Sequence, residues 1–390
     1  MEKRLRVGIL FGGRSGEHEI SLLSAASVFE AIDKLKYDVV PIGITKQGKW
    51  LTAMHAENLL RGKHGAGKHL RAGDPAATTS AAVLAAGDAI IVPPIPSADS
   101  MVPFQTDSRH PESINVDVIF PVLHGTFGED GTIQGLLELA DIPYVGAGVL
   151  GSAAGMDKDV MKRLFAAAGL PIVKHVTILR SEWERDPKRV RREIEKKLKY
   201  PTFVKPANLG SSVGISKVHD KKELAAAIEE AARYDRKIVI EEAVGGKKRK
   251  ARELECSVLG NDEPIASVAG EVVPVKEFYD YAAKYLDEGS DLIIPAKLNK
   301  SALKKVQELA VAAFQAVDCC GLARVDFLMD PKSGKIFVNE INTMPGFTAI
   351  SMYPKLWAAS GLAYSELIDQ LIELALARHA EKKRNQYSRT

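Results

Sequence analysis

The chain has 390 residues, of which 46% are hydrophobic and 26% are charged, and its net charge is +3. This length suits two or three packed domains, and the nearly balanced charge excludes a protein that attracts nucleic acid through a strong overall field. The three cysteines, Cys256, Cys319 and Cys320, have no CxxC spacing, so we expect reduced thiols rather than a disulfide framework or a metal site.

The N-terminal part of the chain predicts a largely parallel sheet. An apolar run at residues 5–11 ends at a glycine pair, and residues 20–29 then have apolar side chains at helical spacing. Two further apolar runs, residues 39–44 and 116–123, are typical of buried strands. We therefore expect an α/β domain with a parallel sheet over residues 1–151.

The segment of residues 50–113 is rich in Ala, Gly and Pro, and we interpret it as an insertion with one possible strand at residues 89–92. The apolar run near the N-terminus is too short for a signal peptide, and no stretch of about 18 apolar residues occurs anywhere. A cytoplasmic protein that does not contact a membrane is therefore expected.

Two further units are predicted, at residues 152–244 and 245–390, because apolar strands alternate there with charged or amphipathic helices. The expected strands are residues 173–179, 202–205, 214–218, 238–243, 253–259, 265–273, 323–329 and 336–341. The expected helices are residues 187–198, 221–234, 301–319 and 364–381.

The strongest chemical pattern lies on two of these strands. Residues two apart on a strand face the same side, so Arg324 and Asp326 share a face, as do Glu340 and Asn342. If the two strands are neighbours, two carboxylates and an amide oxygen converge into a ligand set that suits Mg²⁺. The alternative is that Arg324 only neutralises the two acids as a buried ion pair.

A second pattern indicates phosphate binding. Lys205 ends an apolar strand, and the Gly- and Ser-rich residues 209–214 follow it, so backbone N–H groups of this loop can hold phosphates; an ordinary turn is the alternative. Residues 62–69 have the glycine and lysine spacing of a P-loop, but they lack its hydroxyl residue and its strand. The glycines of residues 8–16 lack the dinucleotide-binding spacing. The basic run at residues 247–252 has no interleaved aromatic residues and is interpreted as a solvated hairpin tip.

Short motifs occur in a fixed order along the chain, at residues 12–21, 123–125, 128–131, 156–158, 204–206, 210–214, 278–285 and 339–346. Through these motifs nearly the whole chain resembles the D-alanine–D-alanine ligases of the ATP-grasp superfamily. The resemblance implies a Rossmann-like pre-ATP-grasp domain followed by a two-lobed ATP-grasp fold. It also implies an ADP-forming ligase that makes D-alanyl-D-alanine for peptidoglycan precursors through an acyl phosphate, without nucleic acid and as a homodimer.

The resemblance also implies a role for each of a set of residues. ATP would contact Lys158, Lys205, Ser211, Ser212, Glu241, Glu242, Val244 and Lys284, and two Mg²⁺ ions, replaceable by Mn²⁺, would bind Asp326, Glu340 and Asn342. The first D-alanine would contact Glu17 and His124, and the second would contact Arg324, Ser351 and Met352. Catalysis would involve Glu17, Ser211, Tyr285, Arg324 and Gly346, under a lid at residues 275–291. Purely structural alternatives remain: Glu17 as a helix-start acid, His124 as a turn residue, Tyr285 as lid packing and Ser351 as a helix N-cap.

Three other functions stay open in the sequence. A D-alanine–D-lactate ligase is disfavoured by Tyr285, which lactate-using branches of the family replace. Another ATP-grasp carboxylate–amine ligase is the second alternative, and Glu242 departs from the lysine that some family members carry there. A nucleotide-binding regulator without chemistry is the third, and it would have no use for Arg324 beside a metal site.

Overall fold

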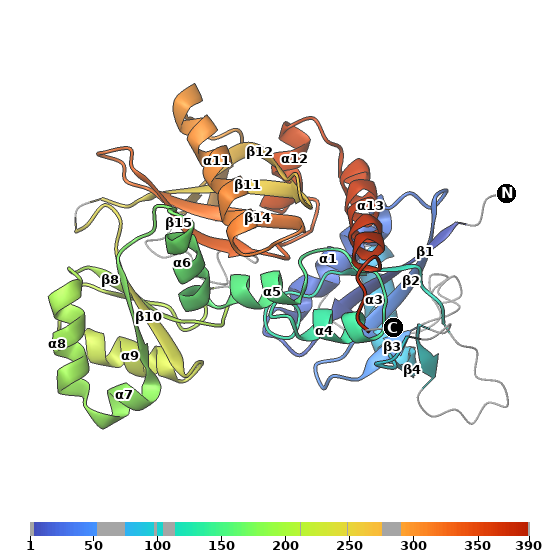
Figure 1. The fold of residues 1–390 in the computed structure, drawn as a ribbon, viewed down its shortest axis with the longest axis horizontal. Coiled ribbons are helices and arrows are strands. Elements are labelled where there is room, and N and C mark those ends of the chain that lie inside the picture. The colour runs from blue at the N-terminus through green and yellow to red at the C-terminus, as the bar shows by residue number, and fades with distance from the viewer. Residues whose placement is uncertain are drawn as a thin grey trace.

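The computed structural model describes residues 4–52, 75–96, 100–103, 114–210, 212–247, 249–274 and 290–388. Three sheets follow one another along the chain, and they form three bodies that lie side by side in Figure 1. No helix in the described part of the chain is both long enough and apolar enough to span a bilayer.

The first sheet has six strands in the order β5-β4-β3-β2-β1-β6. Its strands are β1 (Leu5–Gly12), β2 (Tyr37–Ile44), β3 (Trp50–Thr52), β4 (Asp88–Ile91), β5 (Val102–Pro103) and β6 (Val118–Pro121). The central strand β1 pairs in parallel with β2 and β6, while β3, β4 and β5 extend the sheet in antiparallel fashion. Both faces of β1 are covered, so its run of buried residues does not alternate with polar ones.

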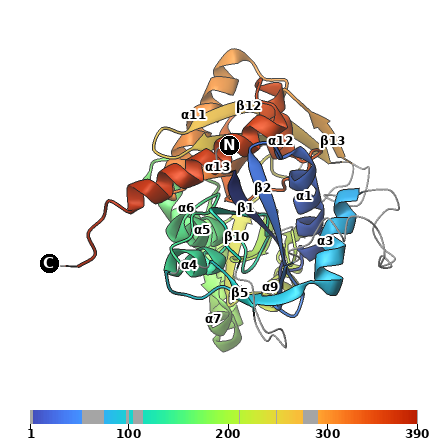
Figure 2. The ribbon, with the colours of Figure 1, turned by 90° about the vertical axis from the view of Figure 1, so that its right-hand side faces the viewer.

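Helices cover this sheet and connect it to the rest of the chain. They are α1 (His18–Ala31), α3 (Pro75–Ala86), α4 (Thr132–Leu139), α5 (Val149–Met156) and α6 (Lys158–Ala167). Figure 2 shows α1 and α3 side by side against the sheet. The predicted insertion therefore adds a helix and strand pairing to the first domain, and the expected strand at residues 89–92 is confirmed as β4.

The second sheet has four antiparallel strands in the order β7-β10-β8-β9, which are β7 (His175–Leu179), β10 (Lys237–Glu242), β8 (Thr202–Pro206) and β9 (Ser216–Val218). Helices α7 (Arg180–Arg185), α8 (Pro187–Lys197) and α9 (Leu224–Ala232) pack on it. The helix α8 begins where Asp186 accepts the backbone N–H of Arg189 and Pro187 occupies the first turn. The body formed by these elements is called the small lobe below.

The third sheet has five antiparallel strands in the order β13-β12-β11-β14-β15. They are β13 (Ser290–Ile293), β12 (Ile265–Pro274), β11 (Arg252–Gly260), β14 (Gly321–Met329) and β15 (Ile336–Asn342). Helix α11 (Lys300–Ala316) packs across this sheet, and α12 (Met352–Ala359) and α13 (Tyr364–Lys382) follow it in the chain. The predicted strands and the long amphipathic helix are confirmed, whereas α7 and α12 were not anticipated.

Apolar cores join the first body, helix α6 and the third body, whereas the small lobe has a core of its own. Met161 and Phe165 of α6 pack with the core beneath the third sheet, and Leu367 and Leu371 of α13 pack with the core of the first. Phe347 is fully buried between these parts, with its ring centroid 5.4 Å from that of Phe120. The domain boundaries predicted at residues 151 and 244 stay predictions, because elements on either side of them share these cores.

Candidate active site

Two adjoining cavities lie where the sheets meet. The first, called the substrate cavity, is lined by Glu17, His124, Gly125, Glu129, Lys158, Arg324, Glu340, Asn342 and Gly346, among others. The second, called the nucleotide cavity, is lined by Lys205, Glu241, Glu242, Glu253, Glu255, Asp326 and Glu340, among others. Ser212, Ile215 and Glu340 line both cavities, so a group held at Glu340 is accessible from either side.

Strand register brings the predicted metal ligands together. Asp326 on β14 lies directly opposite Glu340 on β15, and Asn342 Nδ2 donates to Asp326 Oδ2 at 3.1 Å. The prediction that these strands are neighbours is therefore confirmed. In the described part of the chain no three Asp, Glu, His or Cys side chains form a metal cluster by themselves. Two carboxylates and one amide oxygen leave coordination positions for phosphate or water, as Mg²⁺ sites usually do.

Arg324 pairs with acids on both sides. Its Nε and Nη2 donate to the two oxygens of Asp326 at 2.6 Å each, and its Nε lies 3.0 Å from Glu255 Oε2. Glu255 on β11 lies opposite Asp326, so Glu255, Asp326 and Glu340 form one acidic row across three strands. The ion pair expected in the alternative interpretation is present, yet a carboxylate has about four lone-pair sites, so Asp326 can accept from Arg324 and still bind a cation.

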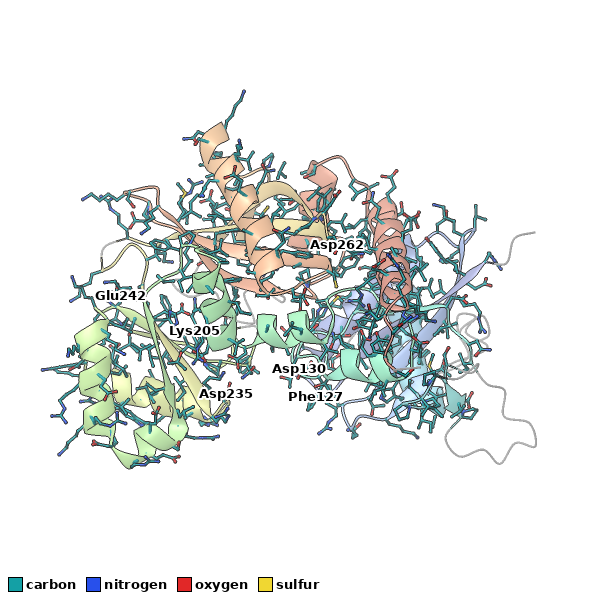
Figure 3. All side chains as sticks on the ribbon, viewed as in Figure 1. Phe127, Asp130, Lys205, Asp235, Glu242 and Asp262 are labelled. Carbon is teal, nitrogen blue, oxygen red and sulfur yellow. The ribbon has the colours of Figure 1, made fainter. Side chains whose placement is uncertain are left out.

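Three lysines face this row from α6 and the small lobe. Lys158 Nζ donates to Leu209 O at 2.7 Å and lies 3.9 Å from Glu340 Oε2. Lys205 Nζ donates to Glu241 Oε2 at 2.9 Å, and Lys162 Nζ lies 3.1 Å from Glu241 Oε1. Figure 3 labels Lys205 and Glu242 on the small lobe, on its side toward the third sheet.

Glu241 is 2% exposed and is ionised because of these lysines. Burial raises its pKa, but Lys162 and Lys205 outweigh burial and hold the pKa at about 2. Burial lowers the pKa of Lys205, but Glu241 and Glu340 outweigh it and raise that pKa above its ordinary value. For the deeper Lys162, burial prevails over Glu241 and lowers the pKa. Glu241 therefore fixes two lysines rather than presenting a free carboxylate.

Glu17 and Glu129 flank one glycine at the opposite end of the substrate cavity. Gly125 donates its N–H to Glu129 Oε1 at 2.8 Å, and a Cβ at Gly125 would lie 2.9 Å from Glu17 Oε2. Gly125 also has a φ of 75°, which side chains rarely allow, so glycine is required there. Burial and the nearby Glu17 raise the pKa of Glu129 to about 8.

His124 is neutral and links two segments. Burial lowers its pKa to about 4. Its Nδ1 lies 3.1 Å from the carbonyl oxygen of Met344 and must therefore carry the proton, so its Nε2 accepts from Ser24 Oγ at 2.8 Å. Ser24 Oγ in turn accepts the N–H of Phe347 at 3.4 Å. Helix α1 thus holds the loop that carries Gly346.

The start of α12 lies beside Gly346. Ser351 occupies the N-cap position of this helix, but its side chain makes no capping hydrogen bond, and its Oγ lies 2.7 Å from Thr348 Oγ1 instead. A Cβ at Gly346 would approach Ser351 Oγ to 3.2 Å. Backbone N–H groups at a helix start attract anions, so Met352 at the first position of α12 can serve a carboxylate.

Not every predicted residue reaches the cavities. Val244, which follows β10, lines neither cavity, and the same holds for Ser351 and Met352 at the start of α12. Glu242 lines the nucleotide cavity, and its Oε1 accepts the N–H of Lys199 at 2.9 Å. Ser211, Lys284, Tyr285 and most of the expected lid lie outside the described residues. Their predicted roles stay predictions.

Four residues at the site were not anticipated from the sequence: Ser24, Glu129, Lys162 and Glu255. Glu129 lies in one of the recognised motifs, so its acidic side chain was visible but no role was assigned to it. Glu255 occupies the same face of its strand as Glu253, and strand periodicity could have indicated it. Ser24 and Lys162 gave no signal in the sequence, because their partners are far away along the chain. Ser24 contacts His124, and Lys162 contacts Glu241.

This chain has a small antiparallel lobe and a larger antiparallel sheet, which enclose lysines and a row of acids. These features define the ATP-grasp class of enzymes. The D-ala D-ala ligase N-terminus family matches residues 6–147, and the D-ala D-ala ligase C-terminus family matches residues 164–373. The chain belongs to the D-alanine–D-alanine ligase family.

Individual relatives agree over nearly the full length. A D-alanine–D-alanine ligase of Heliobacterium modesticaldum is 48% identical over 380 residues, which cover 97% of this chain and 96% of the relative. One of Natranaerobius thermophilus is 49% identical over 387 residues and covers 98% of each chain. Among solved structures, the D-alanine-D-alanine ligase of Coxiella burnetii has a TM-score of 0.78 and 38% identity, covering 98% of this chain and 96% of that chain. The VanG D-Ala:D-Ser ligase of Enterococcus faecalis has a TM-score of 0.80 and 38% identity, covering 96% of this chain and all of that chain.

Proposed function

We propose that this protein is an ADP-forming ligase that joins two molecules of D-alanine for peptidoglycan precursors, at the expense of ATP. The observation that supports it best is the meeting of the two cavities at Glu340, with Lys158 and Arg324 in the lining of the substrate cavity and Lys205 in that of the nucleotide cavity. ATP occupies the nucleotide cavity, so that its terminal phosphate reaches the substrate cavity.

Each cavity has its own task in this proposal. Lys158 and Lys205 bind phosphate oxygens, and Ser211, Ser212 and Lys284 complete this contact from the loop and the lid. Glu242 and Val244 contact the adenosine, while Glu241 acts by positioning the two lysines. Asp326, Glu340 and Asn342 would hold two Mg²⁺ ions, or Mn²⁺ in their place, and these ions would neutralise charge on the phosphates.

The chemistry follows from the poor reactivity of a carboxylate. A carboxylate oxygen of the first D-alanine forms a bond to the γ-phosphorus, the bond to ADP breaks, and an acyl phosphate results. The amine of the second D-alanine then attacks the acyl carbon, and the tetrahedral intermediate expels phosphate. Arg324 and the N–H of Gly346 donate to its oxyanion, a contribution of about 3 kcal/mol per good donor.

The substrates are oriented by groups that line the substrate cavity or lie beside it. Glu17 binds the ammonium of the first D-alanine, in a network with Ser211 and Tyr285, and His124 approaches the first substrate's carboxylate. Arg324, Ser351 and Met352 bind the carboxylate of the second. The lid over residues 275–291 keeps the acyl phosphate from water. The enzyme acts in the cytoplasm as a homodimer.

Phosphate release tests this function directly. Purified protein with ATP and Mg²⁺ should release phosphate with D-alanine and not with L-alanine, and mass spectrometry should detect the dipeptide. Phosphate release without any amino acid would point instead to an unrelated ATPase, and binding without turnover would point to a regulator.

A second acceptor substrate is the main alternative, since one structural neighbour is a D-Ala:D-Ser ligase. A competition assay that offers D-alanine, D-serine and D-lactate together decides between them. The expected product is the D-alanyl-D-alanine peptide in excess, and a predominant D-serine or D-lactate product would revise the specificity.

A further inference from the structure

Among the described residues that line the substrate cavity, Glu129 is the one ionisable group that the proposed reaction leaves without a task. It lies in the loop that Phe127 and Asp130 mark in Figure 3, between the end of β6 and the start of α4. Its Oε1 accepts the N–H of Gly125, and the residue lines the substrate cavity.

The surroundings of Glu129 combine one acid with several cations. Glu17 faces it across Gly125 from the start of α1. Arg324 on β14 and Lys158 on α6 favour its ionised form, but burial and Glu17 outweigh them. The neighbouring His124 is neutral. Two carboxyls that share a poorly hydrated site cannot both ionise readily. Glu17 and Glu129 therefore retain one proton between them near neutral pH when no ammonium is bound beside them.

We propose that Glu129 is a second ammonium-facing carboxyl, which gives up its proton when the amine of the first D-alanine enters beside Glu17. An ammonium between the two acids supplies the positive charge that the empty site lacks. Both carboxyls can then be ionised, and the released proton goes to solvent. This inference rests on the proposed function only in placing the first ammonium at Glu17.

The proposal predicts a particular pH dependence of substrate affinity. The pKa of Glu129 lies at about 8 in the empty site, above its ordinary value, and the bound ammonium lowers it. Binding then releases a proton, so affinity rises with pH, by up to about tenfold per pH unit, until the pH passes the pKa of the empty site. Above about pH 8 no further gain from Glu129 is expected.

Calorimetry measures the released proton. The full-length protein with Mg²⁺ and a non-hydrolysable ATP analogue is titrated with D-alanine at pH 7, in two buffers of different ionisation enthalpy. A group with a pKa of about 8 is about 90% protonated at pH 7, so about 0.9 proton should be released at the first site. Propionate, which lacks the ammonium, should release none.

Glu129→Gln tests the assignment to this residue. Glutamine retains an oxygen for the N–H of Gly125 but has no proton to release. The affinity of wild type for D-alanine, relative to that of the variant, should therefore rise by more than about tenfold from pH 6 to pH 8. Asp130→Asn is the matched control, because Asp130 accepts the N–H groups of Phe127 and Thr132 and does not line the cavity. It should release the same proton as wild type.

The outcomes separate this inference from the proposed function. Wild type that forms dipeptide but binds D-alanine without releasing a proton overturns the role of Glu129 and leaves the function intact. Equal release by Glu129→Gln and wild type also overturns it. If Glu129→Gln does not fold, the comparison of D-alanine with propionate on wild type decides the question. Absence of dipeptide from wild type refutes the proposed function itself.

Discussion

Replacement of Glu241 by glutamine should destabilise the protein strongly, although the side-chain shape is kept. Glu241 holds Lys205 at 2.9 Å and Lys162 at 3.1 Å, and all three are nearly inaccessible to solvent. The difference between a pKa of about 2 and its ordinary value of 4.5 corresponds to about 3 kcal/mol, at about 1.4 kcal/mol per pKa unit. Breaking a buried ion pair by removing one partner costs about 3–5 kcal/mol, which agrees.

The same pKa gives the pH range of the effect. Because the folded-state pKa is depressed, the stabilisation is complete above the unfolded value of 4.5 and is lost as the pH falls toward about 2. The difference between wild type and Glu241→Gln should therefore be constant from pH 6 to pH 8. It should shrink progressively in acid.

Urea unfolding of the nucleotide-free protein, followed by circular dichroism, measures this difference. Glu242→Gln is the control on the same strand, since Glu242 is less buried and accepts only one backbone N–H, and it should change stability by less than about 1 kcal/mol. Adding Lys162→Met to Glu241→Gln removes one unpaired charge and should restore part of the loss. A Glu241→Gln variant within about 1 kcal/mol of wild type at pH 7 would refute the reasoning.

Three further variants test the substrate end of the site. Arg324→Ala should lower the rate of dipeptide formation by about 100-fold or more while a fluorescent nucleotide still binds, and retained turnover would exclude Arg324 as the stabiliser of the intermediate. Asp326→Asn should raise the Mg²⁺ concentration for half-maximal activity by roughly tenfold or more, and an unchanged requirement would argue against Asp326 as a ligand. Ser24→Ala leaves Nε2 of the buried His124 unpaired, at a cost of about 1–3 kcal/mol. The variant should therefore raise KM for the first D-alanine about tenfold. An unchanged KM would mean that the loop at Met344 is held without this hydrogen bond.

Much of this site could be predicted from the sequence because it depends on strand periodicity. The side chains of Arg324, Asp326, Glu340 and Asn342 share faces through spacings of two, and only the pairing of β14 with β15 had to be assumed. A short hairpin connection makes that pairing the default, and the structure has it. The register that places Asp326 opposite Glu340 also depends on a shift in the strand pairing between Asp326 and Phe327, and the apolar pattern does not predict that shift.

The residues missed in the sequence depend on packing between elements far apart in the chain. Lys162 lies on α6, whose other side chains join the core beneath the third sheet, while its ammonium meets Glu241 on β10 of the small lobe. No local pattern indicates such a contact, because a lysine on a helix is usually solvated. Helix α3 of the insertion was not anticipated for a related reason, since this Ala-rich helix has no clear apolar stripe of its own.

The arrangement of charge at this site favours the binding of a cation together with the phosphates. Glu255, Asp326 and Glu340 lie in one row on the third sheet, and Arg324 beside them is already paired with two of these acids. Triphosphate oxygens that approach this row meet like charge, and like charges at contact distance are strongly unfavourable where water is excluded. The lysines of α6 and the small lobe can attract the phosphates from the opposite side, but they cannot remove that repulsion. Asp326, Glu340 and Asn342 would hold a metal ion here, and its positive charge would offset that repulsion. Arg324 would then remain beside the site as the donor for a developing oxyanion.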